Sequence, residues 1–282
     1  MRIQAIVRLE LRRLRRAPGI WLAGLAFTIL LVGGAILPLF ALEERDSELA
    51  TALLLGPATE VVLPMIAILL SYGAIATLRE NGGIKVILGP PIDRNTLLWG
   101  VFVARALVIS AIVILGTIAT AGVITVVSSP PPLRAIAGFF VFSLLAGVNF
   151  VAIGVATSAV FATRVRAIAA LLAGFVVTHA IWDPLISGVR AITGASADDW
   201  WIRLGTWINP LGAYTRALNG VLPPSPHLTV RVDDAGVQAE AGEYVGETLT
   251  TLELTAAVVV LLCWAIGCWL LARWRFATQS LA

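Results

Sequence analysis

The chain has 282 residues, of which 59% are hydrophobic and only 13% are charged, and its formal net charge is +3. In a soluble globular domain about a quarter of the residues are charged. A chain this apolar cannot bury its apolar surface in one soluble core, which excludes an ordinary soluble enzyme or binding domain. A small positive net charge does not indicate a nucleic-acid partner either, because in such a chain the position of each charge matters more than the sum.

The amino-terminal segment, residues 1–16, is predicted to form an amphipathic helix in which apolar residues interleave with six arginines. This pattern is typical of a helix that lies along the inner membrane surface, with its arginines near anionic headgroups. A charge cluster that only fixes the topology is the alternative. The apolar run that follows, residues 20–42, is too long for a signal peptide and contains no small-residue cleavage site, so we predict a retained membrane helix.

Six apolar segments are long enough to cross a hydrocarbon core, which requires roughly 20 residues in a helix. They cover residues 20–42, 58–78, 97–127, 135–161, 167–186 and 254–272. The sequence therefore predicts an all-α membrane protein with about six transmembrane helices, and residues 1–282 form a single transmembrane domain. We expect Arg105 to extend from the third segment to the headgroups, and Glu60 to begin the second segment at the outer surface.

The distribution of basic residues predicts the orientation of these helices. If the amino terminus is cytoplasmic, the inside regions 1–18, 79–105, 162–166 and 272–282 hold 14 of the 20 Lys and Arg residues and only three acidic residues. Cytoplasmic loops carry an excess of Lys and Arg. Both termini are therefore predicted to be cytoplasmic.

A large outer loop, residues 187–253, is then predicted before the last membrane helix. The tryptophans of its middle part, residues 200–222, suit the membrane–water interface, so we expect a helix that lies on the outer leaflet or dips part-way into it. Pro223, Pro224 and Pro226 would end that helix, and residues 228–247 are compatible with a small extended flap.

The most informative stretch is the cytoplasmic loop 79–96, between the second and third segments. Gly82 and Gly83 break the helix that leaves the membrane. Residues 84–88 then fit a turn or two of interfacial helix, which Pro90 and Pro91 stop, and Asp93 suits the N-cap of the next helix. Such a short rigid element, held between two membrane helices, is able to transmit a push from a cytoplasmic partner, although an ordinary inter-helix turn explains the same residues equally well.

This loop resembles the cytoplasmic loop of the ABC-2 family of ABC-transporter permeases, in which an Arg-Glu pair leads into a glycine, a short apolar helix, a proline and an arginine that opens the next helix. The matching residues are Arg79, Glu80, Gly83, the run from Ile84 through Lys85 to Leu88, Pro90 or Pro91, and Arg94. Together with the N-cap Asp93, these are the residues that we expect to form the ATPase-coupling loop. The amino-terminal helix is similar to the elbow helix of that family, and the segment 207–214 is similar to one found before the last membrane helix. The resemblance covers nearly the whole chain, but the second proline, Pro91, leaves the coupling register open.

The resemblance implies that the loop docks on a separate ATPase subunit and couples ATP hydrolysis to movement of the membrane helices. It also implies an exporter-type permease that pairs with a second copy or a related chain, as a multi-pass protein in the plasma membrane of a prokaryote. The chain holds no G-x-x-x-x-G-K-[ST] loop, so ATP and Mg²⁺ are expected in the partner. The chain itself is expected to be neither an enzyme nor a binder of cofactors, metal ions or nucleic acid.

Three polar residues within the spans are candidates for a pathway. His179 and Asp183 are four residues apart, so the carboxylate is able to orient the imidazole for proton transfer or substrate contact; a helix-stabilising pair near the interface is the alternative. Asn149, with Thr157 and Ser158, is able to line a pathway, and hydrogen bonding between helices is the alternative.

Two other classes of function remain open. An ATP-independent secondary transporter or channel often carries inverted repeats and charged residues at the membrane midplane, neither of which is evident here. An intramembrane enzyme needs a nucleophile–base pair or a metal cluster, and no cluster of metal ligands is apparent. We expect Cys263 and Cys268 to be small buried packing residues, without a disulfide or a metal.

Overall fold

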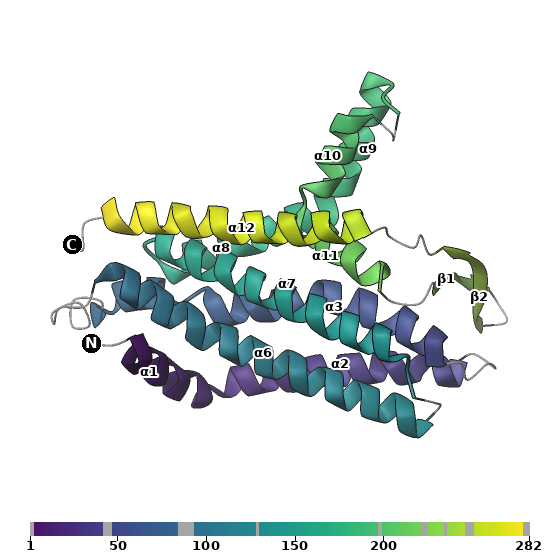
Figure 1. Ribbon diagram of the computed structural model, residues 1–282, viewed down its shortest axis with the longest axis horizontal. Helices are drawn as coiled ribbons and strands as arrows, with labels where there is room; N and C mark the ends of the chain where they lie inside the picture. Colours follow the sequence, from purple (N-terminus) through teal and green to yellow (C-terminus); the bar gives the residue numbers. More distant parts are fainter. Residues whose placement is uncertain are drawn as a thin grey trace.

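The computed structural model describes residues 3–41, 47–83, 93–127, 130–196, 199–221, 225–233, 236–245 and 251–278. Long helices run side by side along one direction (Figure 1). The helices are α1 (Ile3–Arg15), α2 (Pro18–Ala41), α3 (Ser47–Ser71), α4 (Ala76–Glu80), α6 (Arg94–Val127), α7 (Leu133–Val160), α8 (Arg164–Val176), the π-helix η1 (Val177–Ile181), α9 (Trp182–Thr193), α10 (Trp200–Trp207), α11 (Pro210–Asn219) and α12 (Thr251–Thr278). An antiparallel hairpin of β1 (Ser225–Asp233) and β2 (Gly236–Val245) overlaps the predicted flap, residues 228–247, and begins three residues before it.

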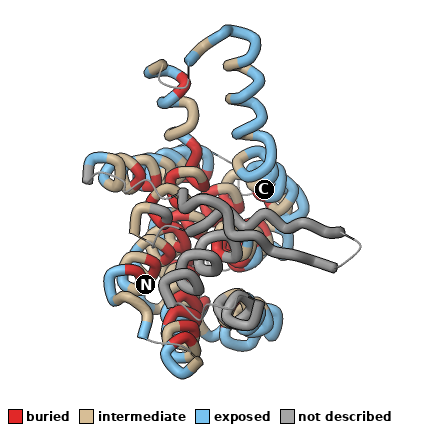
Figure 2. The backbone as a smooth tube through the Cα atoms, turned by 90° about the vertical axis from the view of Figure 1, so that its right-hand side faces the viewer, coloured by how far each residue is buried: buried red, intermediate tan, exposed pale blue. Residues whose placement is uncertain are grey.

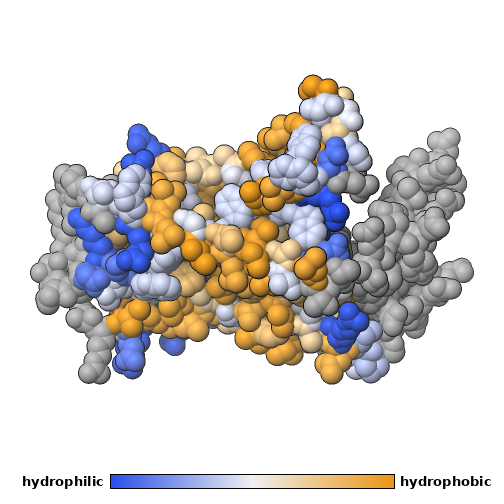
Figure 3. All heavy atoms as spheres, turned by 45° about the horizontal axis from the view of Figure 1, so that its top comes forward, coloured by the Kyte–Doolittle hydropathy of each residue, from blue (hydrophilic) through white to orange (hydrophobic). Residues whose placement is uncertain are grey.

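Five helical segments among the described residues are long and apolar enough to cross a membrane. They are Thr59–Glu80, Arg94–Val127, Leu133–Val160, Arg164–Thr193 and Leu252–Phe276. The pair formed by α1 and Pro18–Gly34 is bent by 73° and counts as a sixth if it is taken as one broken span. Figure 3 shows, on the face in view, a wide band of apolar residues across the middle of the molecule. These features confirm the predicted all-α membrane protein.

The two ends of the chain lie at the same end of the bundle, which we call the terminal end (Figure 1). The described ends of the loop after α4 and the junction between α7 and α8 also lie there, whereas β1 and β2 lie at the opposite, hairpin end. Hydrophilic residues gather at the terminal end in Figure 3. Both termini and the described ends of the loop 79–96 thus lie at one end of the bundle, and the side of the membrane on which they lie stays a prediction.

Helix α7 is at the centre of the bundle and packs against α3, α6 and α12. Leu63, Ile109 and Phe139, from α3, α6 and α7, are completely buried in the core. In the end-on view of Figure 2 the buried residues gather among the helices of the bundle, and α9 and α10, which are labelled in Figure 1, project away from it with largely exposed residues. The two least buried spans are Arg164–Thr193, 11% buried, and Leu252–Phe276, 17% buried.

The second predicted segment differs most from the observed helices. Helix α3 already begins at Ser47, so Glu60 lies well inside a helix rather than at its start. The helix is interrupted after Ser71 and resumes as α4. The fifth predicted segment is also longer than expected: α8, η1 and α9 form a continuous helical run of 30 residues, about 45 Å long, which exceeds the roughly 30 Å of a hydrocarbon core.

The aromatic segment of the outer loop forms two helices instead of one. Asn209 caps the second helix, α11, by accepting a hydrogen bond from the N–H of Leu211 at 3.0 Å, and Pro210 follows at its first position. Helix α10 exposes Trp200 and Trp201, whereas α11 packs into the bundle and buries Tyr214 completely. The single predicted helix is therefore two helices, one exposed and one packed into the bundle, and their position relative to the leaflet stays a prediction.

Helix α1 packs against α6, and its buried face contains Glu10. Arg105 of α6 was predicted to extend to the headgroups. Instead it is only 6% exposed and forms an internal ion pair. Its Nη1 lies 2.8 Å from Oε2 of Glu10, and its Nε donates to the carbonyl of Leu70 at 2.8 Å. The prediction was wrong because Glu10 supplies a compensating charge inside the protein, which makes burial of the guanidinium tolerable.

The prediction that both cysteines are buried was also wrong for Cys263, which is exposed on α12, while Cys268 is half-buried. Both are free thiols. On the lipid-facing side of a membrane helix an apolar thiol needs no packing partner.

Candidate functional site

The side-chain hydroxyl of one residue, Ser158, forms hydrogen bonds to the backbone on both sides of the interruption between α3 and α4. Oγ of Ser158, on α7, accepts hydrogen bonds from the N–H groups of Ile75 at 3.0 Å and Ala76 at 3.1 Å, and it donates to the carbonyl of Tyr72 at 2.9 Å. An interrupted helix leaves backbone groups without partners, and these must be satisfied inside a membrane protein. Ser158 thus fixes the position of α4 relative to α7.

The last two residues of α4 contact the junction between α7 and α8. Nη1 of Arg79 donates to the carbonyl of Phe161 at 3.4 Å. Oε1 of Glu80 accepts a hydrogen bond from the N–H of Arg164 at 2.9 Å, and Oε2 lies 3.5 Å from its Nε. Arg164 is the first residue of α8, so the carboxylate of Glu80 also lies where the dipole of that helix favours a negative charge.

Both ends of the loop 79–96 meet at the end of α12, on Phe276. The guanidinium carbon of Arg79 lies 5.1 Å from the centre of the Phe276 ring, and that of Arg94 lies 5.7 Å from it. Arg94 Nη1 also donates a hydrogen bond to the Phe276 carbonyl. Cations within about 6 Å of an aromatic centre are attracted to the ring, and Phe276 is only 1% exposed. The two arginines therefore connect the loop to α12.

Asp93 is the N-cap of α6, as predicted. One carboxylate oxygen accepts a hydrogen bond from the N–H of Thr96 at 3.3 Å, and the other accepts one from the Thr96 hydroxyl. These hydrogen bonds, first that of the Thr96 side chain, hold the pKa of the exposed Asp93 carboxyl below its usual value. The carboxylate thereby fixes the point at which the chain re-enters a helix.

The cluster formed by Arg79, Glu80, Arg94, Ser158, Phe161, Arg164 and Phe276, which we call the loop anchor, thus joins α4, α6, the α7–α8 junction and α12. Gly82 has a φ of +66°, a left-handed conformation that favours glycine and turns the chain after α4, and Gly83 follows it. The predicted loop residues Ile84, Lys85, Leu88 and Pro90 lie outside the described residues.

Sequence reasoning found Arg79, Glu80 and Arg94 but missed their partners. Ser158 was predicted to line a pathway or to form hydrogen bonds between helices, and its hydrogen bonds to the segment between α3 and α4 favour the second possibility. Phe161, Arg164 and Phe276 were not singled out, because each is far from the loop in the sequence. The one feature of the local sequence that could have indicated these residues is their position at or near helix ends.

The structure does not join the three pathway candidates to one another. Asn149 is 3% exposed, and neither its amide nitrogen nor its amide oxygen has a hydrogen-bond partner in the described part of the chain. His179 lies in η1 and stacks on Phe175, with ring centres 5.3 Å apart. No hydrogen bond or ion pair between His179 and Asp183 occurs among the described residues, and both are exposed.

No group of three or more His, Cys, Asp or Glu side chains in the described ranges is placed to hold a metal ion. A family model described as ABC-2 family transporter protein matches residues 4–281. No curated protein matches the chain.

Proposed function

The chain belongs to the ABC-2 family of transporter proteins, and from this premise we propose that it is the permease subunit of an ABC exporter that is driven by a separate ATPase. The permease pairs with a second copy or a related chain, and an ATPase subunit binds beneath each of them. ATP and Mg²⁺ are bound by the ATPase. This chain supplies the docking loop, the membrane pathway and an outer gate.

The observation that carries this proposal is the loop anchor. A loop that only connected two helices would need no contacts beyond its own ends. Here Arg79 and Glu80 contact the α7–α8 junction, and Arg79 and Arg94 share the ring of Phe276. A displacement of the loop is therefore passed to helices on both sides of α7.

In the proposed cycle, closure of the two ATPase subunits on ATP pushes on residues 79–94 from the cytoplasm. Helix α4 moves with α7 because Ser158 bonds to both sides of the interruption between α3 and α4. Helices α8 and α12 follow through Glu80 and Phe276. The two helix bundles then rock against each other, and the pathway between them opens outward.

The sequence offers a specific test, because Lys85 is the single lysine of the chain and lies in the loop. The tagged protein is isolated from its native membrane and treated with a short amine-reactive cross-linker, and the products are identified by mass spectrometry. We expect a cross-link between Lys85 and an ATPase that carries a Walker A loop. The Lys85→Arg variant, which keeps the charge, should retain the ATPase but lose this cross-link.

A second pair of variants separates docking from internal support. Glu80→Arg should uncouple ATP hydrolysis from transport because it repels Arg164. If Glu80 acts only through Arg164, the double exchange Glu80→Arg with Arg164→Glu restores coupling; if Glu80 also contacts the ATPase, it does not. A preparation that contains no ATPase under mild conditions would contradict the proposal and favour an ATP-independent carrier.

A further inference from the structure

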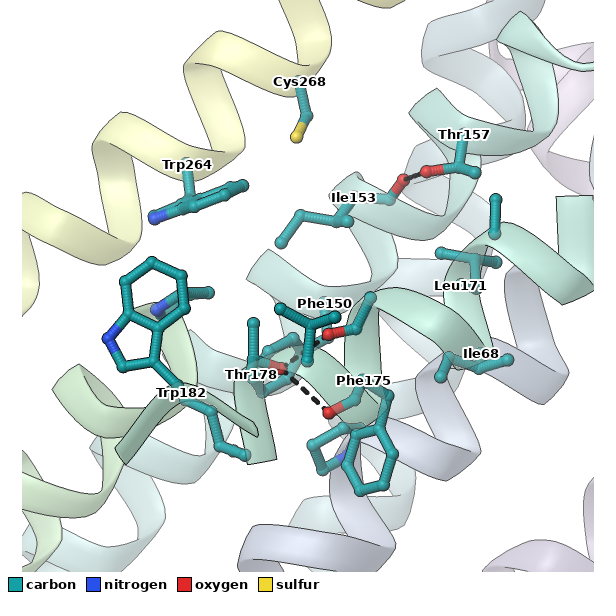
Figure 4. Close-up of a pocket in the computed structure, with 16 residues that line it drawn as sticks. Ile68, Phe150, Ile153, Thr157, Leu171, Phe175, Thr178, Trp182, Trp264 and Cys268 are labelled. Carbon is teal, nitrogen blue, oxygen red and sulfur yellow. Dashed lines mark hydrogen bonds between the residues drawn. The ribbon is translucent and has the colours of Figure 1, made fainter. Parts of the chain in front are cut away.

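We propose that a cavity between α7, α8 and α12 binds a single hydrocarbon chain of an amphipathic molecule. The cavity has a volume of about 340 Å³, within the range of small-molecule sites in proteins. Figure 4 shows Trp264 and Cys268 of α12 on one side and Leu171 and Phe175 of α8 on the other, with Ile153 of α7 between them. Binding of such a chain does not require the ATPase, so this inference and the proposed coupling can fail separately.

The polar groups of the wall are already occupied by bonds within the protein. The hydroxyl of Thr157 donates to the carbonyl of Ile153 at 2.8 Å, and that of Thr178 to the carbonyl of Gly174 at 2.9 Å. The indole nitrogens point to backbone carbonyls as well: Trp182 donates to Gly205 at 3.0 Å and Trp264 to Ile208 at 2.7 Å. Apart from the thiol of Cys268, no side chain that lines the cavity has a free hydrogen-bond donor for a ligand.

This arrangement selects the chemistry of the ligand. A polar molecule would give up its hydrogen bonds to water and gain none from the wall, which is costly. An alkyl chain has no hydrogen bonds to water that it could lose, and it gains dispersion contacts with the apolar wall. The cavity is therefore suited to a hydrocarbon chain, and not to a sugar, a nucleotide or an inorganic ion.

The location of the cavity agrees with a ligand that comes from the bilayer. The two helices on either side of it, α8 and α12, belong to the least buried spans. Both turn large apolar side chains outward: Val176 is 48% and Ile266 57% exposed. The π-helix η1 also contributes Val177 and Thr178 to the wall, and such turns occur frequently at functional sites.

A second copy of this chain fits the cavity less well. A helix with its side chains is about 10–12 Å wide, so a cavity of about 340 Å³ has room for a few side chains of a second copy but not for its helix. An extended alkyl chain has a much smaller cross-section. We therefore assign the cavity to a lipid-like chain that enters between α8 and α12.

The test uses the full chain in phosphatidylcholine vesicles that contain palmitic acid with a photoreactive diazirine on its chain. After irradiation, the adducts are located by peptide mass spectrometry. We expect adducts concentrated on the α7, α8 and α12 residues of the cavity wall, and we expect an excess of unlabelled palmitic acid to compete them away. Adducts that spread evenly over exposed residues of all spans, without saturation, would show contact with bulk lipid only and would overturn the proposal.

Two glycines provide a matched pair of variants. A Cβ atom at Gly174, in the wall, meets no heavy atom within 4 Å, so the leucine of Gly174→Leu enters free space. Gly122 of α6 has equally free surroundings but does not line the cavity. We expect Gly174→Leu to reduce the saturable labelling to the bulk level and Gly122→Leu to leave it unchanged. If Gly174→Leu does not fold, Ala170→Phe blocks the same wall; labelling that survives in a folded blocking variant contradicts the proposal.

The cysteines test the competing occupant. In Cys263→Ala, Cys268 is the only thiol of the chain. A short bis-maleimide that joined Cys268 of two copies in the membrane would show that a second copy covers the cavity, and would overturn the assignment. Protection of Cys268 from an apolar maleimide by palmitic acid, without cross-linking, would support it.

Discussion

Glu10 and Arg105 are oppositely charged side chains in a mostly apolar structure, and each permits the burial of the other. Glu10 is 4% exposed and Arg105 6% exposed, and their side chains meet at 2.8 Å. Glu10 also forms an ion pair with Arg13, whose side chain is half exposed; Nη1 of Arg13 lies 2.9 Å from Oε1 of Glu10. The Glu10 carboxylate therefore has one buried partner and one surface partner. The contributions of these two ion pairs to the stability of the fold are directly comparable.

Replacing the carboxylate by an amide should destabilise the protein strongly. Glu10→Gln leaves the Arg105 guanidinium buried without a counter-charge, and breaking a buried pair in this way costs about 3–5 kcal/mol. We expect a marked fall in the thermal unfolding temperature in detergent, followed by tryptophan fluorescence. The control, Arg13→Gln, removes a surface partner worth about 0–1 kcal/mol. Equal losses for the two variants would mean that the Glu10–Arg105 pair does not hold α1 against α6.

At the scale of elements, the start of α6 depends on the ionisation of Asp93. Its usual pKa of 3.8 is lowered in the folded chain, first by the Thr96 hydroxyl. A carboxyl with a lowered folded pKa stabilises the fold fully above its unfolded pKa, and this contribution is lost as the pH falls through the folded value.

We therefore expect Asp93→Ala to lower the unfolding temperature at neutral pH, and the difference from the wild type to shrink once the pH falls below about 4. The measurement is thermal unfolding in detergent between about pH 7 and about pH 3. Asp93→Asn is the control, because the amide oxygen still caps the helix but does not titrate. A difference between wild type and Asp93→Ala that stays constant over the whole range would argue against the cap.

Helices α3 and α7 approach closely where Gly154 faces Ser71. A Cβ atom at Gly154 would lie 2.4 Å from Cβ of Ser71 and 3.6 Å from the carbonyl oxygen of Ala67. Gly154→Ala should force the two helices apart, and overpacking of this kind costs about 1–3 kcal/mol.

The corresponding measurement is again the unfolding temperature in detergent, which Gly154→Ala should lower. Gly33→Ala serves as the control, because a Cβ at Gly33 meets no heavy atom within 4 Å and alanine favours a helix over glycine. The control should be neutral or stabilising. A loss of stability for Gly33→Ala as large as that for Gly154→Ala would show that the contact with Ser71 is unimportant.

The helices were largely predictable from the sequence, because a long apolar run is a local signal. The contacts of the loop anchor were not. Ser158 is 82 residues from Ala76, and Phe276 is 182 residues from Arg94, and only the packing of distant helices brings such residues together. Arg105 was mispredicted for the same reason, since its partner is 95 residues away. The π-helix η1 has no local sequence signal that distinguishes it from an ordinary helical turn.

For the whole molecule, the remaining prediction is its orientation in the membrane. Gln4 on α1 and Ile192 on α9 are both exposed, and the arginine distribution predicts that the former is cytoplasmic and the latter outside. With both natural cysteines replaced by alanine, a membrane-impermeant maleimide should label Ile192→Cys in intact cells. It should label Gln4→Cys only after permeabilisation, and the reverse pattern would invert the topology.

The Glu10–Arg105 pair also determines when the amino-terminal helix takes its place. A ribosome adds about 5–20 residues per second, so the 95 residues between the two side chains take about 5–20 seconds to synthesise. Throughout this interval the carboxylate of Glu10 has no buried partner, and α1 remains at the membrane surface. Although α1 leaves the ribosome before α6, it reaches its final position only after α6 has been inserted.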